Sequence, residues 1–292
     1  MVRHFFCPSS NGVAKTTYRQ PPGAPLYLAR LTKQGDHPMS QLSPTDIAGH
    51  LVNARKSHVA WDAGDTAGLS MEDVYAVQDL VTDQLGLEIG AWKTSPLEDP
   101  AAPFAAPIYA RDIHASGAQI VSSDLFVIGL EGEIAFRFNR DFLSVEHPYT
   151  RDEIIAGISE MLPLIEVVDT RMVNGMEQDA SLKMADNQSN AAIVIGDPVT
   201  SGWQDVDATT QAVSLTVNGE TAYGPLSNSP VEDLFAMMAG TINVCAARGR
   251  PVKAGHIITT GSCTGLLFFK PGAEAVLEMP GVGRVEASFP KT

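Results

Sequence analysis

The sequence predicts an α+β fold built on a mixed β-roll, with a smaller helical part at its N-terminal end. Short β-prone runs separated by turn residues dominate the second half of the chain, and only four helices are expected in 292 residues. Strands and helices do not alternate as they would in a parallel βαβ fold. We expect an N-terminal extension over 1–38, a helical part over 39–106 and a β-roll domain over 107–292.

Each of the four helices is marked by a residue that favours a helix start. A serine or threonine stands just before the first helical position, where its hydroxyl accepts a hydrogen bond from a free backbone N–H group. Proline follows the serine in two cases, at the position where a helix tolerates it. The predicted helices cover 44–58, 71–85, 151–161 and 230–248, with Ser43, Ser70, Thr150 and Ser229 as their caps.

The β-prone runs are bounded by glycine, proline and asparagine. Asn218-Gly219 follows the run over 213–217 and is typical of a two-residue hairpin turn. The polar stretch 174–190 is predicted to be a loop, and its length favours function or mobility over a simple connection. Further strands are expected at 90–93, around Glu166, and at 193–195, 257–260 and 266–269, with several short ones between 108 and 142.

The charge and cysteine content exclude several classes of protein. A net charge of −14 argues against nucleic acid or an anionic membrane as the main partner, because both attract basic surfaces. No apolar run approaches the roughly 20 residues of a membrane span. The three cysteines, Cys7, Cys245 and Cys263, have neither zinc-like spacing nor an even count for disulfides, so a reducing cytoplasm fits best.

The first 38 residues differ in composition from the rest of the chain. They carry five basic residues against the single acid Asp36, so their formal charge is about +4 while the remainder carries about −18. A Pro-Pro-Gly-Ala-Pro stretch from Pro21 and the lack of sustained periodicity favour a loosely ordered arm. A basic, acid-poor arm is also typical of an organelle transit peptide.

Two carboxylates share one face of a predicted strand over 130–138. Side chains alternate between the two faces of a strand, so Glu131 and Glu133 point to one side and the apolar Ile134 and Phe136 to the other. A Glu-x-Glu pair of this kind is most often a solvated polar face. The pair therefore gains significance only together with a further acidic residue.

Glu166 is that residue, because it lies inside the apolar run Leu164-Ile165-Glu166-Val167-Val168. A buried, ionised carboxylate is costly unless a partner compensates it. An ion pair with Arg137, Arg171 or Lys93 would provide one. A divalent cation held by Glu131, Glu133 and Glu166 together would provide a stronger one, and hard oxygen ligands in this number suit Mg²⁺ or Mn²⁺.

Five blocks of the sequence carry a family resemblance. They are Leu130–Phe138, LIEVVDTR at Leu164–Arg171, ADN at Ala185–Asn187, VIG at Val194–Gly196 and AGHIITTGSCTG at Ala254–Gly265. These blocks resemble the fumarylacetoacetate hydrolase superfamily and, within it, the branch of 2-keto-4-pentenoate hydratases and 2-oxo-3-hexenedioate decarboxylases. The resemblance covers about residues 42–289, with the blocks in family order. It begins only after Met39, so we expect Met39 to be the natural start and residues 1–38 to lie outside the native protein.

This resemblance implies a fumarylacetoacetate-hydrolase-like mixed β-roll and a function. It implies Mg²⁺ or Mn²⁺ bound by Glu131, Glu133 and Glu166, a small-molecule 2-oxo acid substrate from aromatic catabolism, and a homo-oligomer. Similar enzymes carry a lysine that reaches the substrate pocket in a Gly-x-Lys-Ile-Gly pattern. Lys93 matches that lysine, although Thr94-Ser95 replaces the Ile-Gly that follows it.

Four further residues are candidates for contact with a substrate. The turn Gly261–Gly265 offers backbone N–H groups and the hydroxyls of Ser262 and Thr264 to a carboxylate, although such a turn alone is a weak signal. Asp186 and Asn187 are expected to close over the site or to orient a ligand, with a plain turn-forming pair as the equal alternative. We interpret Cys263 as structural.

One position departs from the pattern of the similar hydratases. They usually carry an Asp-Tyr-Gly or Asp-Phe-Gly whose aspartate is a candidate for proton transfer. Counting back from Glu131 without gaps places Phe104, followed by Ala105-Ala106, at that point. One acid–base group is therefore missing on this alignment.

The expected activity is a metal-dependent hydratase (lyase) that adds water to a 2-hydroxy-2,4-dienoate through an enolate. Lys93 is expected to steady the substrate carboxylate or transfer a proton, and Ser262 to bind a substrate oxygen. The alternatives are a 2-oxo-3-hexenedioate-type decarboxylase, an acylpyruvate-type C–C hydrolase, and a binding or partner subunit that keeps the fold without the chemistry.

Overall fold

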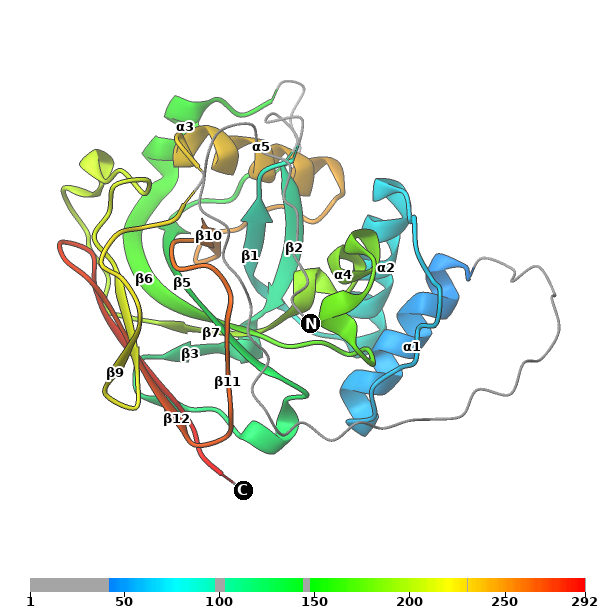
Figure 1. Ribbon diagram of the computed structural model, residues 1–292. Helices are drawn as coiled ribbons and strands as arrows, with labels where there is room; N and C mark the ends of the chain where they lie inside the picture. The colour runs from blue at the N-terminus through cyan, green and yellow to red at the C-terminus, as the bar shows by residue number, and fades with distance from the viewer. Residues whose placement is uncertain (1–41, 98–102, 144–147, 230, 292) are drawn as a thin grey trace, which may run out of the picture. The chain divides into compact units, whose positions relative to one another are not determined.

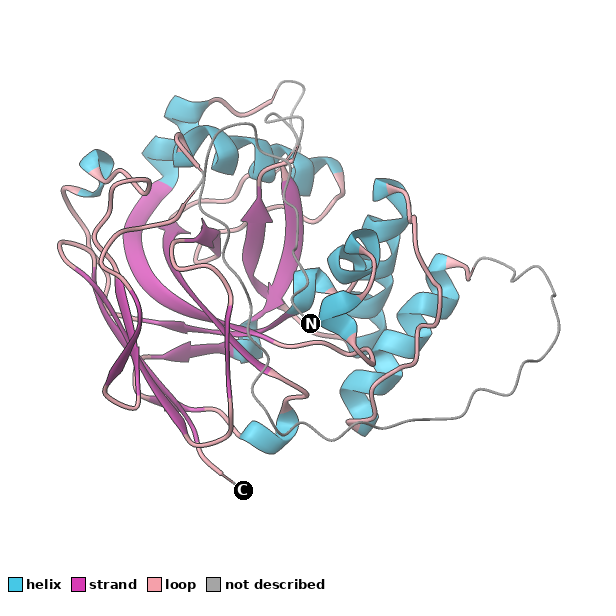
Figure 2. Cartoon of the chain, viewed as in Figure 1, coloured by secondary structure: helices cyan, strands magenta, loops and turns pink. Residues whose placement is uncertain are grey.

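A computed structural model describes residues 42–97, 103–143, 148–229 and 231–291 (Figure 1). The expected extension over 1–38 lies outside these described residues. Mixed β-sheets with few helices make up the described chain, as Figure 2 shows, so the predicted α+β class is confirmed. The proposed division at 106/107 falls inside a strand of the main sheet, and the division into domains stays a prediction.

The larger sheet has eight strands of mixed direction and carries the residues of interest. Its order is β2-β1-β10-β5-β6-β7-β3, and β11 pairs with β5 alongside β10. β1 runs parallel to β10, β10 antiparallel to β5, and β5 antiparallel to β6. The strands are β1 (Ile89–Ser95), β2 (Phe104–Tyr109), β3 (Ile113–Ala115), β5 (Ile128–Phe138), β6 (Ile158–Val168), β7 (Asn190–Ile195), β10 (Ile257–Ser262) and β11 (Leu267–Phe269).

A five-stranded sheet packs against the larger one. Its order is β4-β13-β12-β8-β9. The Asn218-Gly219 turn joins β8 to β9 with both residues in the left-handed region, φ 53° and 79°, which confirms the predicted hairpin. Its strands are β4 (Ala118–Gln119), β8 (Ser214–Val217), β9 (Glu220–Tyr223), β12 (Ala273–Met279) and β13 (Gly283–Phe289).

The two N-terminal helices confirm their predicted starts. Helix α1 (Pro44–Ser57) begins after Ser43, whose hydroxyl accepts from the Asp46 backbone while the Asp46 carboxylate reaches back to the Ser43 backbone. Helix α2 (Met71–Leu85) begins after Ser70 and ends at Gly86, which takes the left-handed conformation that favours glycine. Both helices end within a residue of the prediction.

Two other helices were predicted too long. Helix α3 (Arg151–Gly157) ends four residues early, because the chain then enters β6 at Ile158 and pairs with β5. Helix α5 (Leu234–Ala247) begins four residues late: its cap is Asp233, whose carboxylate accepts from the backbones of Phe235 and Ala236. Tertiary pairing and a better cap outweigh the local signals in these two cases.

The stretch predicted to be a loop over 174–190 is only partly one. It contains a short helix, α4 (Ala180–Ala185), capped by Asp179. After α4 come three consecutive non-glycine residues, Asn187, Gln188 and Ser189, in the left-handed region with φ of 51°, 51° and 59°. Such a conformation is unfavourable for residues with a side chain and persists only where the surroundings impose it.

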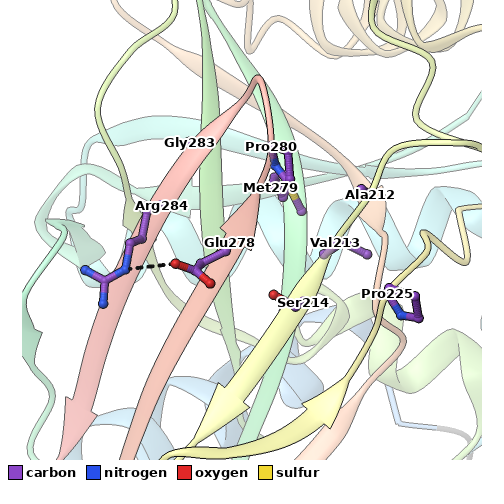
Figure 3. A pocket seen from close by; sticks show the side chains of 9 residues that line it. All are labelled: Ala212, Val213, Ser214, Pro225, Glu278, Met279, Pro280, Gly283 and Arg284. Carbon is purple, nitrogen blue, oxygen red and sulfur yellow. Dashed lines mark ion pairs between the residues drawn. The ribbon is translucent and has the colours of Figure 1, made fainter.

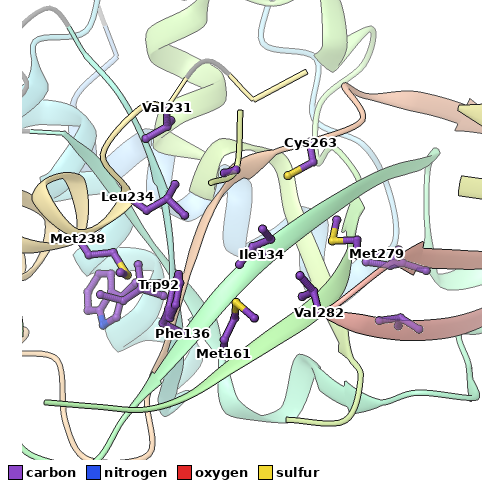
Figure 4. Close-up of a cluster of buried hydrophobic side chains, with 14 of the residues drawn as sticks. Trp92, Ile134, Phe136, Met161, Val231, Leu234, Met238, Cys263, Met279 and Val282 are labelled. Atoms are coloured by element: carbon purple, nitrogen blue, oxygen red, sulfur yellow. The ribbon is translucent and has the colours of Figure 1, made fainter. Parts of the chain in front are cut away.

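The hydrophobic core lies on the face of the larger sheet that α5 covers. Figure 4 shows Trp92 of β1 and Phe136 of β5 packed together below Met238 of α5. Because side chains alternate along a strand, Lys93, Glu131 and Glu133 occupy the opposite face from these residues. A second cluster of buried apolar residues joins α1, α2 and α4. One face of the sheet is thus apolar, and the other is available for a polar site.

A glycine marks the close approach of the two sheets. A Cβ atom on Gly196, which follows β7, would lie 2.5 Å from the backbone oxygen of Arg284 in β13 and 2.8 Å from Pro163 Cγ in β6. We predict that Gly196→Ala lowers the free energy of unfolding by about 1–3 kcal/mol, because backbone atoms must move. The measurement is denaturant unfolding followed by circular dichroism.

Gly49→Ala is the matched control for this change. Gly49 lies exposed in α1, and apart from its chain neighbours and its own helix backbone no atom of the described residues lies within 4 Å of the place that a Cβ atom would take. Alanine there should therefore stabilise by about 0.5–1 kcal/mol. Equal stabilities for the two alanine variants would contradict the close packing of the sheets at Gly196.

Candidate metal centre

Three glutamates from two neighbouring strands converge on one point. Glu131 and Glu133 lie on β5, and Glu166 on β6 is the direct cross-strand partner of Glu131. One carboxylate oxygen from each lies within 4.8 Å of the others. Glu133 and Glu166 are fully buried, and the Glu131 side chain is 15% exposed, so the cluster opens to solvent on the Glu131 side.

Lys93 is the cation that compensates Glu166. Its Nζ atom lies 2.8 Å from Glu166 Oε1 and 3.4 Å from Glu131 Oε2, and its side chain is almost completely buried. The other two candidates for this role are engaged elsewhere: Arg137 pairs with Glu160 and Arg171 with Asp186. Of the three cations considered from the sequence, Lys93 is therefore the correct one.

Two further donors hold the carboxylates in place. Asn190, the first residue of β7, donates from Nδ2 to Glu166 Oε1 at 2.9 Å. The backbone N–H of Gly261 donates to Glu133 Oε2 at 2.9 Å. Glu133 Oε1 and Glu166 Oε2 are buried and make no hydrogen bond within the described part of the chain. One oxygen of each fully buried carboxylate is thus fixed, and the other is free.

The charges of the cluster perturb one another strongly. Burial raises the pKa of Glu133 well above its usual range, and the neighbouring charges of Glu166 and Glu131 raise it further. Burial also raises the pKa of Glu131, against the opposing effect of Lys93. Burial alone would lower the pKa of Lys93, but the three carboxylates outweigh it and raise that pKa, so Lys93 is an ammonium at neutral pH.

A divalent cation fits this set of residues. Three carboxylates and one ammonium leave a formal charge of −2 in a buried space, which a divalent ion would neutralise. The two unpaired oxygens, on Glu133 and Glu166, are free to bind a cation. The three glutamates offer carboxylate oxygens, which hard ions such as Mg²⁺ and Mn²⁺ prefer over imidazole or thiolate ligands.

The turn after β10 stands beside the cluster, and its two hydroxyls differ in their surroundings. Ser262 is half-buried, pairs in register with Glu133, and its hydroxyl is among the groups that lower the pKa of Glu131 against the dominant effect of burial. Thr264 is buried, accepts from the Gly132 backbone at 2.9 Å and donates to the Gly265 carbonyl. Thr264 therefore fixes the backbone between the two glutamates, and its contact with a substrate stays a prediction.

Asp186 and Asn187 occupy buried positions next to β7. Both oxygens of Asp186 accept from Arg171 Nε, at 2.7 and 2.8 Å, and Arg55 adds a third contact at 3.0 Å. Asn187 Nδ2 donates to the hydroxyl of Tyr109. These contacts make Asp186 an anchor of the left-handed turn, and a role for either residue in substrate binding stays a prediction.

Phe104 is the cross-strand partner of Ser95, two residues beyond Lys93 on β1. It is the first residue of β2, fully buried, and its ring stacks on Tyr75 of α2 with the centroids 6.1 Å apart. It belongs to the second apolar cluster, under the N-terminal helices. An apolar side chain at this point is accounted for by that packing.

One contributor to the site was missed from the sequence: Asn190, which holds Glu166. Asn190 begins the β-prone run that ends in Val194-Ile195-Gly196, so an amide placed beside a predicted strand was the available signal. The turn Gly261–Gly265 was expected to offer backbone N–H groups to a carboxylate, and in the structure the Gly261 N–H group binds the carboxylate of Glu133.

The two cysteines that the structure describes are unreactive thiols. Burial raises the pKa of Cys263 to about 11 and that of Cys245 to about 12, so both stay protonated at neutral pH. This supports the interpretation of Cys263 as structural. Among the helices that the structure describes, none combines the length and apolar character needed to cross a bilayer.

A hollow of about 440 Å³ lies on the five-stranded sheet, away from the glutamates (Figure 3). Apolar and small side chains such as Val213, Pro225 and Met279 line most of it, and Arg284 pairs with Glu278 at its edge. The residues that line it include a single carboxylate, too few for a metal site. The carboxylate cluster on the larger sheet is therefore the better candidate for a functional site.

With this geometry in place, comparison with known proteins shows the family. Residues 87–289 match the model of the fumarylacetoacetate (FAA) hydrolase C-terminal family. The chain belongs to that family. All three glutamates, Lys93 and Asn190 lie inside the matched range.

The curated relatives include both of the activities expected from the resemblance. A 4-oxalocrotonate decarboxylase of Pseudomonas putida is 29% identical over 137 residues, covering 47% of this chain and 51% of the relative. A 2-hydroxyhexa-2,4-dienoate hydratase of Comamonas testosteroni is 29% identical over 160 residues, covering 54% and 59%. The chain thus spans little more than half the length of these relatives.

A solved structure supports the fold over a longer range. The 4-oxalocrotonate decarboxylase from Pseudomonas putida G7, complexed with magnesium and adipate, matches with a TM-score of 0.71 at 23% identity. The match covers 84% of this chain and 97% of that one. The shared fold therefore extends beyond the sequence matches.

The cluster predicts the effect of removing one ligand. Glu166→Ala should abolish stoichiometric Mg²⁺ or Mn²⁺ binding, because Lys93 would then neutralise half of the remaining charge and only two carboxylates would be left. Elemental analysis after gel filtration measures the metal content, and circular dichroism checks the fold. Unchanged stoichiometry would contradict the assignment.

Glu160→Ala is the matched control for that experiment. Glu160 lies on the same strand, six residues earlier, and is half-buried in an ion pair with Arg137. Its removal should leave the metal content at the wild-type value.

Proposed function

We propose that the protein is a divalent-metal-dependent hydratase that adds water to a 2-hydroxy-2,4-dienoate or 2-keto-4-pentenoate-type acid. One observation carries the proposal: a buried cluster of three glutamates and Lys93 has a formal charge of −2 when all three carboxylates are ionised, and it contains two unpaired oxygens. The chain belongs to the fumarylacetoacetate (FAA) hydrolase C-terminal family, and several of its relatives are named as hydratases. Both findings support this activity.

Glu131, Glu133 and Glu166 would hold the metal ion. Mg²⁺ is the preferred ion because the ligands are carboxylates and because the decarboxylase with the shared fold was obtained with magnesium and, in another complex, with calcium. When bound, such an ion supplies positive charge that stabilises a negative 2-oxygen as an enolate forms. Asn190 and Gly261 would keep the ligand oxygens oriented.

Lys93 and Ser262 would act on the substrate directly. The ammonium of Lys93 sits between Glu131 and Glu166, where it can attract the substrate carboxylate and carry a proton. Because its pKa is raised, Lys93 stays protonated at neutral pH and would donate hydrogen bonds to the substrate, and it is not a free base. Ser262, half-buried beside Glu131, would donate a hydrogen bond to a substrate oxygen.

The reaction balances in two steps. The dienol first becomes the ketone: the 2-hydroxyl loses its proton, the double bonds shift, and a proton is added at the distal carbon C5. Water then adds across the remaining C3–C4 double bond, with its oxygen at C4 and a proton at C3. Both steps would pass through a negatively charged 2-oxygen, and a divalent ion held by the three glutamates would supply the positive charge that stabilises it.

Decarboxylation of a 2-oxo-3-hexenedioate-type acid is the second candidate. It is favoured by the 4-oxalocrotonate decarboxylase among the relatives and by the shared fold. Loss of CO₂ itself generates the dienolate and needs no initial deprotonation, so a carboxylate at the place of Phe104 would not be required. The homo-oligomer and the cytoplasmic location expected from the sequence are proposed with the function.

Product analysis tests the function. Mg²⁺-loaded protein should convert 2-hydroxypenta-2,4-dienoate to a product 18 mass units heavier, with loss of the ultraviolet absorption of the diene. Loss of CO₂ from 2-oxo-3-hexenedioate without hydration of the first substrate would favour the decarboxylase. Ligand-induced thermal stabilisation without turnover of either compound would indicate a binding protein.

Lys93 should matter for turnover more than for metal binding. We predict that Lys93→Met keeps stoichiometric metal, because the three carboxylates remain, and lowers kcat at least tenfold. Lys183→Met is the control, since Lys183 is a half-buried lysine of α4 that contacts the Met176 carbonyl. A wild-type rate for Lys93→Met would remove Lys93 from the mechanism.

A further inference from the structure

A pair of neutral polar side chains lies beside the carboxylate cluster. The Ser95 hydroxyl donates to Gln188 Oε1 at 3.5 Å, and Gln188 Nε2 donates to Ser95 Oγ at 3.3 Å. Both residues are half-buried, whereas Lys93, Asn190 and Glu166 of the cluster are buried. These long contacts leave the pair free to accept other partners.

Two separate segments place this pair next to the cluster. Ser95 follows Lys93 by two residues on β1, so its side chain points to the same face about 7 Å further along the strand. Gln188 precedes Asn190 by two residues, and Asn190 binds Glu166. A ligand with a short carbon chain could therefore reach from the cluster to the pair.

The backbone at Gln188 is held in an unusual conformation. Gln188 is the middle of the three left-handed residues, and glutamine rarely adopts positive φ. The turn is fixed on one side by the ion pair of Asp186 with Arg171, and on the other by the bond from Asn190 to Glu166. Such enforced conformations concentrate at ligand-binding positions.

We propose that Ser95 and Gln188 bind the distal end of the substrate and select 2-oxo acids whose distal end is uncharged. This rests on the proposed function, because the 2-oxo acid end must occupy the cluster for the distal end to reach the pair. A hydroxyl and an amide offer hydrogen bonds without charge. A distal carboxylate that bound this neutral pair would lose its hydration, and neither the hydroxyl nor the amide would serve as its counter-ion.

The charged residues of the cluster also disfavour a distal carboxylate. Lys93 is the one charged residue of β1, and it already pairs with Glu131 and Glu166. Glu131, on the solvent side of the cluster, would repel a second carboxylate. A monoacid with an alkyl or alkenyl end avoids both costs, which favours hydration of a monoacid over decarboxylation of a diacid.

Two saturated acids of equal length provide the test. 2-Oxohexanoate ends in a methyl group and 2-oxoadipate in a carboxylate, so calorimetric titration of each into Mg²⁺-loaded protein compares only the distal end, without turnover. Wild type should bind 2-oxohexanoate at least tenfold more tightly. Gln188→Lys should reduce this preference at least tenfold, because it adds a counter-ion for the carboxylate.

Two further variants complete the test. Gln188→Glu has nearly the same shape as wild type and should widen the preference at least threefold by repulsion. Gln204→Lys adds the same charge at an exposed position before β8 and should leave the preference unchanged.

The outcomes separate this inference from the proposed function. Equal affinities of wild type for the two acids, or a preference that none of the Gln188 variants changes, would overturn the role of the pair and leave the proposed function standing. Failure of both acids to bind would overturn the two together.

Discussion

Three carboxylates and a single ammonium group share one buried site, so negative charge is in excess there. Much of the structure is arranged around this excess of charge. Each buried charge is tolerable only because it is fixed by a specific neighbour: Lys93 for Glu166, Asn190 for the same carboxylate, and the Gly261 backbone for Glu133. These neighbours satisfy some of the oxygens and leave two free. Lys93 neutralises only part of the negative charge of the three carboxylates, and a bound divalent cation would neutralise the rest.

The contacts behind the cluster explain how two distant parts of the chain meet there. Arg171 donates to the backbone carbonyl of Asn190 and to Asp186, and Asp186 also binds Arg55 of α1. The charged groups thus form a buried path from helix α1 through the left-handed turn to Glu166. The same path imposes the conformation of Gln188, so the turn that supports the metal ligand also positions the residue proposed to select the substrate.

The sequence predicted the parts of this site that follow from local rules. Alternation along a strand placed Glu131 and Glu133 on one face, and the apolar surroundings of Glu166 marked it as buried and in need of a partner. Ser43, Ser70 and the Asn218-Gly219 turn were equally predictive, because a cap or a hairpin turn depends on a few adjacent residues.

Features that depend on tertiary contacts were not predictable in this way. Residues 158–161 look compatible with a continuing helix, but pairing with β5 makes them strand. The choice of Lys93 among three possible cations depends on the order of β1, β10 and β5 in the sheet.

The cluster is expected to bind one divalent cation, and every proposed step depends on this ion. Titration of the protein with Mn²⁺, followed by the electron paramagnetic resonance signal of free Mn²⁺, tests it directly. We expect one tight site per chain, displaced by Mg²⁺ and lost when Glu131, Glu133 and Glu166 are all replaced by alanine. A wild-type protein that binds no Mn²⁺, or a triple variant that still binds it, would contradict the assignment of the metal centre.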